Sequence, residues 1–127
     1  MWPFLLLSGN EKEDSIIFSE SLKKYGDFQR VYKKGKSYAN KYLVMYIMKQ
    51  DTQRNRIGIS VSKKVGNSVK RNRARRLMRE SYRHIEDKLP SGYDFIIIAR
   101  NTINDKKCSE VEKSLISAFR RTGVLKK

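Results

Sequence analysis

The chain has 127 residues, with 29 Lys and Arg against 13 Asp and Glu, so its formal net charge at pH 7 is +16. This length suits one domain with a single core and is too short for two independent cores. The excess positive charge points to a polyanionic partner. One cysteine excludes an internal disulfide and a cysteine-rich zinc site, and one histidine leaves little room for a histidine-based nuclease or metal centre.

The N-terminal segment differs in charge from the rest of the chain. Residues 1–20 contain one basic and four acidic side chains, a net charge of −3, which leaves +19 for residues 21–127. The apolar start, MWPFLLL, is too short to cross a membrane and lacks a basic flank. We predict a disordered extension of unassigned role over 1–14, one domain over 15–127, no membrane association and, from the cysteine usage, a cytoplasmic location.

The first half of the chain predicts a helix followed by strands. Residues 25–34 place Phe28, Val31 and Tyr32 on one helical face, and Gly35 ends the helix. The β-rich runs 42–49 and 56–61 predict an antiparallel hairpin, preceded by a short strand at 37–39.

The second half alternates helix and strand. A Lys-rich loop, SKKVGN, leads to a basic helix that is capped by Asn67 or Ser68 and ends near residue 86. Residues 93–100 read as a buried strand, and a last helix, capped by Asp105 or Ser109, runs to residue 121. This order predicts an α+β fold with a small mixed sheet, helices mainly on one face, and a βαβ crossover around the basic helix.

The basic helix separates into two faces when each residue advances by about 100°. The apolar face consists of Ala74, Leu77, Met78, Ser81, Tyr82 and Ile85. The opposite face carries Asn72 and arginines that have almost no acidic neighbours, with Glu80 and Arg73 at its margin. A solvated charged face is the ordinary explanation of a charge run, but uncompensated arginine favours phosphate binding, because guanidinium groups grip phosphate with two hydrogen bonds.

Aromatic side chains form a second candidate surface. Both faces of strand 42–49 are apolar or aromatic, so the face not covered by the basic helix needs another cover or a ligand. Phe28, Tyr32 and Tyr46 could line a groove for unpaired bases, although spacing alone favours core aromatics. We interpret His84 as structural or solvated and Cys108 as part of the core, and no pair of carboxylates predicts a metal site.

The run GISVSKKVGNSVKRNRARRLMRESYR, with its central Arg71-Asn72-Arg73, resembles the signature of the bacterial ribonuclease P protein subunit. The upstream DFQRVYKKGKSYANKYLVMYI and the downstream YDFIIIAR and EVEKSLISAFRR are similar to the same family. The resemblance covers about residues 18–127 and leaves out the first 14 or so.

The resemblance implies a ribonucleoprotein enzyme whose chemistry is carried by its RNA. Members bind ribonuclease P RNA and precursor tRNA, and the holoenzyme removes the 5′ leader by hydrolysis with Mg²⁺ held mainly by the RNA. No protein partner is required. The implied fold is αβββαβα with a four-stranded mixed sheet and a left-handed βαβ crossover, ferredoxin-like or like the second domain of a small-subunit ribosomal protein.

The resemblance also implies roles for individual positions and reverses the core interpretation of the aromatic residues. The positions that match the family's leader-binding cleft and its edge are Phe28, Tyr32, Tyr46, Lys63, Lys64, Arg71 and Asn72. The positions that match the helix face toward the catalytic RNA are Arg73, Arg75, Arg76 and Arg79. The alternatives are a structural RNA-binding protein, such as a ribosomal protein, and a stand-alone nuclease, which the scattered acids disfavour.

Overall fold

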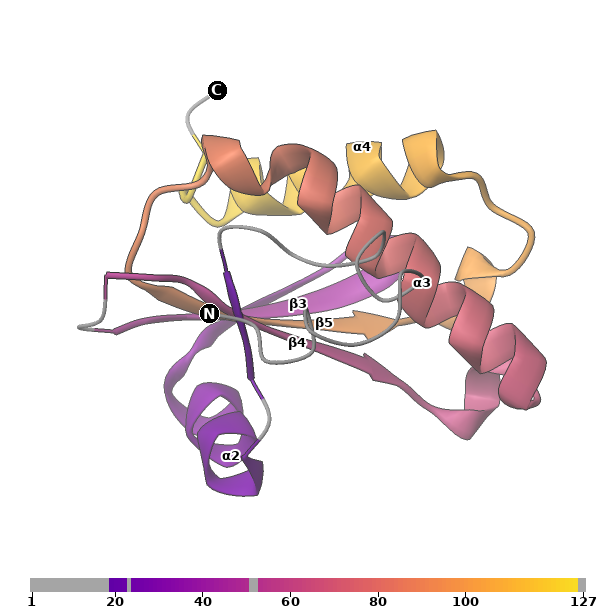
Figure 1. The fold of residues 1–127 in the computed structure, drawn as a ribbon, viewed down its shortest axis with the longest axis horizontal. Coiled ribbons are helices and arrows are strands. Elements are labelled where there is room, and N and C mark those ends of the chain that lie inside the picture. The colour runs from indigo at the N-terminus through magenta and orange to yellow at the C-terminus, as the bar shows by residue number, and fades with distance from the viewer. Residues whose placement is uncertain (1–18, 23, 51–52, 126–127) are drawn as a thin grey trace, which may run out of the picture.

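A computed structural model describes residues 19–22, 24–50 and 53–125, which form a single mixed sheet between helices. Helices α3 and α4 lie on one face of the sheet and α2 lies on the other (Figure 1). The extension predicted for residues 1–14 falls outside the described residues. In the part of the chain described, no helix is long and apolar enough to cross a membrane.

The sheet has the strand order β1-β4-β5-β3-β2. Its strands are β1 (Glu20–Ser21), β2 (Lys36–Ala39), β3 (Leu43–Lys49), β4 (Arg56–Val61) and β5 (Tyr93–Ala99). The helices are α2 (Tyr25–Lys34), α3 (Ser68–Ile85) and α4 (Cys108–Arg121), with single 3-10 turns η2 (Lys63–Val65), η3 (Glu86–Lys88) and η4 (Asn101–Ile103). The α+β class and the helix positions predicted from the sequence are confirmed.

Two expectations about the sheet are wrong. The sheet has five strands rather than four, because Glu20 and Ser21 pair in parallel with Arg56 and Ile57 at one edge. The runs 42–49 and 56–61 do not form a hairpin, because β5 lies between them, antiparallel to β3 and parallel to β4. A strand as apolar as β5 is most stable where both faces and both edges are covered, and the centre of the sheet provides that position.

The caps of the two long C-terminal helices follow different rules. Asn67 caps α3 through its side-chain oxygen, which accepts from the Lys70 amide at 3.0 Å, so the Asn67 alternative is confirmed. Neither predicted residue caps α4. The N-cap is Lys107, whose amide donates to the Glu110 carboxylate at 2.9 Å, so the acceptor comes from the first turn of the helix itself.

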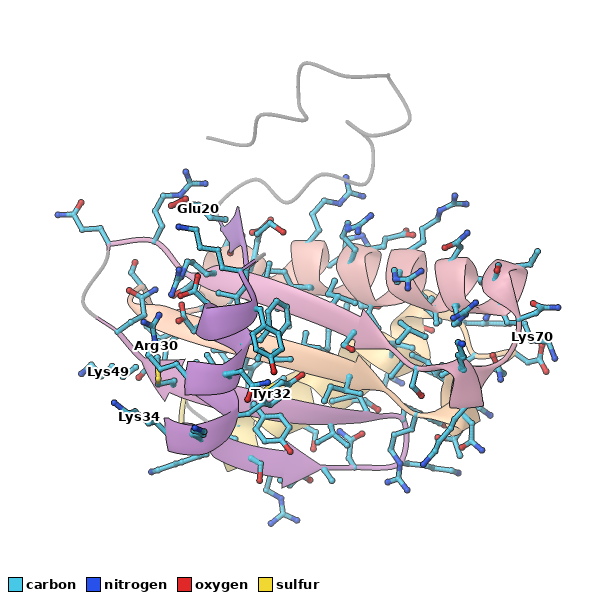
Figure 2. The ribbon with its side chains drawn as sticks, turned by 90° about the horizontal axis from the view of Figure 1, so that it is seen from below. Glu20, Arg30, Tyr32, Lys34, Lys49 and Lys70 are labelled. Atoms are coloured by element: carbon cyan, nitrogen blue, oxygen red, sulfur yellow. The ribbon has the colours of Figure 1, made fainter. Side chains whose placement is uncertain are left out.

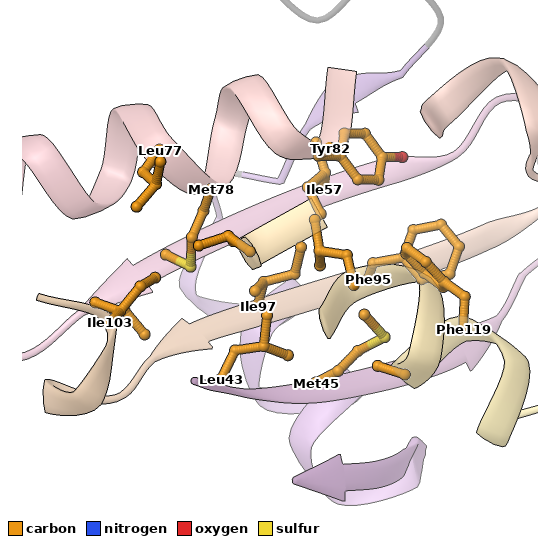
Figure 3. Close-up of a cluster of buried hydrophobic side chains, with 14 of the residues drawn as sticks. Leu43, Met45, Ile57, Leu77, Met78, Tyr82, Phe95, Ile97, Ile103 and Phe119 are labelled. Carbon is orange, nitrogen blue, oxygen red and sulfur yellow. The ribbon is translucent and has the colours of Figure 1, made fainter. Parts of the chain in front are cut away.

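The main core lies between the sheet and the pair α3 and α4 (Figure 3). The predicted apolar face of α3 is confirmed, since all six of its residues are buried. They meet side chains from alternate positions of β3 and β5, such as Met45, Phe95 and Ile97. Burial of a large apolar side chain stabilises a fold by about 1.5 to 3 kcal/mol, so this layer holds the basic helix in place.

Asn55 secures the start of β5 against β4. Its side-chain amide donates to the Pro90 carbonyl at 2.8 Å and its oxygen accepts from the Tyr93 amide at 2.9 Å. Only 6% of Asn55 is exposed, so water cannot replace these bonds freely.

We therefore expect Asn55→Ala to lower the free energy of unfolding by about 2 to 4 kcal/mol, because it leaves a buried donor and a buried acceptor without partners. Urea denaturation measures the loss. The control is Asn101→Ala at an exposed asparagine, which should change stability by less than about 0.5 kcal/mol. Equal effects of the two substitutions would contradict the role of Asn55.

Candidate nucleic-acid interface

The sheet face that carries α2 also carries a cluster of aromatic rings. The Tyr32 and Tyr46 rings meet edge to face with 4.9 Å between centroids, and the Phe28 and Tyr32 rings are 6.3 Å apart. All three are partly buried around a small core of Leu22, Val31 and Ile96. Figure 2 views this face, with the Tyr32 side chain extending from α2 over the sheet. The structure therefore brings together the three aromatic residues that the sequence singled out.

Phe28 occupies space that only glycine leaves free. A Cβ atom on Gly58, in β4, would lie 2.7 Å from Cζ and 2.8 Å from Cε1 of the Phe28 ring. Real Cβ atoms do not approach a neighbour so closely, and the contact is with a rigid ring. The Phe28 ring thus packs directly on the backbone of Gly58, and the missing side chain of Gly58 lets α2 lie this close to the sheet.

The floor of this surface continues past α2. The sheet register places Val44, Ile98 and Ser60 side by side on the same face as Tyr46, and each is partly exposed. Burial raises the pKa of the Tyr32 hydroxyl, and the neighbouring Tyr46 raises it further, so Tyr32 stays a neutral hydrogen-bond donor at physiological pH. The result is an apolar strip with aromatic walls and neutral polar groups, a surface suited to stacking unpaired bases.

An ion-pair network links the N-terminal half of α2 to strands β4 and β5. Arg56 grips the buried Asp94 with two hydrogen bonds of 2.8 and 2.7 Å and reaches Asp27 of α2 at 3.2 Å. The hydrogen bond to Asp94 raises the pKa of Arg56, against the opposing effect of burial. Arg30 also contacts Asp27, at 3.0 Å. Because these carboxylates are surrounded by guanidinium groups, they do not suit a divalent cation such as Mg²⁺.

The sequence did not identify this network as part of the surface. An aspartate inside the otherwise apolar run YDFIIIA was the available signal, because a charge in a buried strand requires a partner. Tyr25 was also missed. It precedes Phe28 by three residues and Tyr32 by seven, which places it on the same face of α2, and it is 78% exposed.

The polar and basic side chains predicted for the edge of the cleft lie where β4 leads into α3. Lys63 and Lys64 are exposed on η2, directly after the end of β4. Arg71 follows in the first turn of α3 and donates to Ser68 Oγ at 3.3 Å, while its Nε is buried without a hydrogen-bond partner. Asn72 is exposed, and its oxygen accepts from Arg75 at 2.9 Å. In Figure 2, Lys70 marks this end of α3, opposite Lys49.

The arginines of α3 point away from the main core. Among the described residues, no carboxylate oxygen lies within 4.0 Å of the guanidinium nitrogens of Arg71, Arg75 or Arg79. Arg76 is exposed on the same helix. Arg73 differs from the others, because it donates to the Lys106 carbonyl at 2.9 Å and so leans toward the segment before α4.

The structure therefore separates the predicted site residues into two surfaces. The aromatic cluster lies on the α2 face of the sheet, whereas α3 packs on the opposite face and carries its arginines outward. Lys63, Lys64, Arg71 and Asn72 lie at the η2–α3 junction, at one end of the sheet. This arrangement offers one surface for unpaired bases and another for phosphates.

Sequence comparison gives a consistent family. Residues 18–123 match the model of the family Ribonuclease P. The chain is 49% identical over 107 residues to the ribonuclease P protein component of Clostridioides difficile (84% of this chain, 94% of the relative). It is 55% identical over 98 residues to that of Lachnoclostridium phytofermentans (77% of this chain, 84% of the relative).

Solved structures agree with the sequence comparison. The fold is similar to that of the Staphylococcus aureus RNase P protein, with a TM-score of 0.74 and 37% identity over 84% of this chain and 98% of the other. It is also similar to the RNase P protein from Thermotoga maritima, with a TM-score of 0.73 and 30% identity over 80% of this chain and 96% of the other. The chain described here belongs to the ribonuclease P protein family.

Proposed function

We propose that this chain is the protein subunit of ribonuclease P, which binds the catalytic RNA and the 5′ leader of precursor tRNA and promotes 5′ maturation. The observation that carries the proposal is the pairing of an aromatic strip with a separate arginine helix in a member of this family. The protein is the non-catalytic subunit. Mg²⁺ is held mainly by the RNA, since Asp27 and Asp94, the acids beside the aromatic cluster, are paired with arginines.

The leader is the part of the substrate that suits the aromatic strip. A single-stranded leader has unstacked bases, and each base that stacks on an aromatic ring gains about 1 to 3 kcal/mol. Phe28, Tyr32 and Tyr46 offer such rings beside an apolar floor. Lys63, Lys64, Arg71 and Asn72 follow at the end of β4, where they would contact the sugar-phosphate backbone as the leader leaves the strip.

The catalytic RNA would bind along α3. Arg73, Arg75, Arg76 and Arg79 lie within two turns of one helix, so a single RNA helix or junction can neutralise several of them at once. Two polyanionic RNAs repel each other, and a protein of net charge +16 between them lowers that repulsion. The protein thereby favours the complex of the RNA subunit with precursor tRNA.

Reconstitution with precursor tRNA tests this function. We expect the protein, without any further protein, to stimulate leader removal by the catalytic RNA at low Mg²⁺. The protein without the RNA should not cleave the precursor. A structural RNA-binding protein, such as a ribosomal protein, would give no stimulation. Cleavage without the RNA subunit would identify a stand-alone nuclease and overturn the proposal.

Loss of one ring should affect precursor binding selectively. We expect Phe28→Ala or Tyr46→Ala to weaken binding of precursor tRNA to the holoenzyme by roughly 5- to 150-fold, the equivalent of one lost stacking contact. Binding of mature tRNA should be unchanged because it lacks the leader. Fluorescence anisotropy with both RNAs measures the two affinities.

Tyr38→Ala is the matched control for Tyr46→Ala. Tyr38 is also a partly buried strand tyrosine, but it pairs with Met45 in the register and therefore points to the opposite face, under Arg121. It should leave the preference for precursor tRNA intact. Equal weakening of precursor and mature tRNA by Tyr46→Ala would contradict the leader assignment.

Phosphate contacts of the α3 arginines should be measurable in how strongly salt weakens binding of the protein to the catalytic RNA. We expect Arg75→Gln or Arg79→Gln to reduce the slope of log K against log salt for binding the catalytic RNA by about 0.7 to 0.9, one phosphate contact each. Lys88→Gln, at an exposed lysine on η3, removes the same charge and is the control. A slope that Arg75→Gln and Lys88→Gln change equally would show that only net charge matters.

A further inference from the structure

The one histidine and the one cysteine of the chain meet at the junction of α3 and α4. His84 is the penultimate residue of α3, and Cys108 is the first residue of α4. Their Nδ1 and Sγ atoms are 4.0 Å apart. Residues separated by 24 positions thus place the two best transition-metal ligands of this chain together, on the face of the sheet opposite the aromatic cluster.

Glu112 completes the group. It lies four residues after Cys108, on the same face of α4, and its carboxylate Oε1 is 2.8 Å from His84 Nδ1. The ligand atoms of His84, Cys108 and Glu112 all lie within 4.8 Å of one another. Side chains of His84 and Glu112 are 45% and 31% exposed, so an ion and a water molecule can reach them.

We propose that His84, Cys108 and Glu112 form a binding site for Zn²⁺ or a similar transition-metal ion, with water as the fourth ligand. Zinc bonds of about 2.0 to 2.3 Å in tetrahedral geometry place ligand atoms about 3.3 to 3.8 Å apart. The distances of 2.8 and 4.0 Å bracket this range, so small side-chain rotations reach it. The Cys108 thiol loses its proton to solvent when it binds the ion.

The charge balance and the surroundings support this site. A thiolate and a carboxylate supply two negative charges, which match a divalent ion locally, although the net charge of +16 opposes cation binding. Ser81 Oγ lies 3.4 Å from Cys108 Sγ and gives the sulfur a polar neighbour. Because the ligands come from both helices, the ion would link the end of α3 to the start of α4.

Metal titration of the full chain tests the proposal. In moderate salt, which screens the net charge, Zn²⁺ is titrated against a chelating dye, and Co²⁺ is titrated separately to detect thiolate-to-cobalt absorption. We expect one ion per chain and at least a tenfold rise in Kd for each of Cys108→Ser, His84→Gln and Glu112→Gln. The cobalt–thiolate band should vanish in Cys108→Ser.

Asp105→Asn is the control, because it removes one negative charge just before α4 at an exposed site whose φ of 66° suits asparagine. It should leave the Kd for Zn²⁺ unchanged, and circular dichroism checks that every variant is folded. Absence of saturable binding, or binding that survives Cys108→Ser or His84→Gln, would show that the three side chains form only a hydrogen-bonded helix contact. An unchanged Kd in Glu112→Gln would overturn the three-residue site.

Discussion

The position of β5 in the middle of the sheet is the constraint on which the other parts depend. It pairs with β3 over seven positions and with β4 over six, and helices cover both of its faces. Phe95 and Ile97 join the main core, while Ile96 supports the aromatic cluster. The basic helix and the aromatic strip are therefore built on the two sides of one strand, and their relative placement follows from its alternation.

Charge and packing are divided between opposite faces of α3. The buried face contributes several side chains to the main core, each worth about 1.5 to 3 kcal/mol, whereas like-charged pairs on a helix surface cost only about 0.2 to 0.5 kcal/mol each. Folding therefore tolerates the row of Arg71, Arg75 and Arg79. Because the core holds these groups outward without carboxylate partners among the described residues, their charge remains available to a polyanion.

Local patterns in the sequence predicted the features that depend on local interactions, namely helix bounds, the buried face of a helix and a helix cap. Helical spacing predicted the bounds of α2 and the buried face of α3, and the asparagine cap of α3 was one of two options. Long-range pairing was not predictable in the same way. Nothing in runs 42–49 and 56–61 shows that a strand 32 or more residues later separates them, so the hairpin was the natural but wrong inference. The two-residue β1 is too short to show any period.

The candidate site shows the same limit. Spacing placed Phe28 and Tyr32 on one helical face, but whether Tyr46 faces them depends on tertiary packing, which the family resemblance supplied. Likewise, the sequence favours a structural or solvated role for His84 and a core position for Cys108 when each is considered in its own helix. Only the packing of α3 against α4 makes them neighbours.

Gly58 sets the width of the aromatic strip. It has no functional group, yet the Phe28 ring rests where its side chain would be. A methyl group there would push the ring and α2 outward, and so widen the strip, without removing any side chain that we propose to contact RNA. Under the proposed function, variation at this position would therefore alter the affinity for the leader while every side chain proposed to contact the leader stayed the same. In a survey of natural variants, such a change would be mistaken for a neutral one if only chemically active side chains were examined.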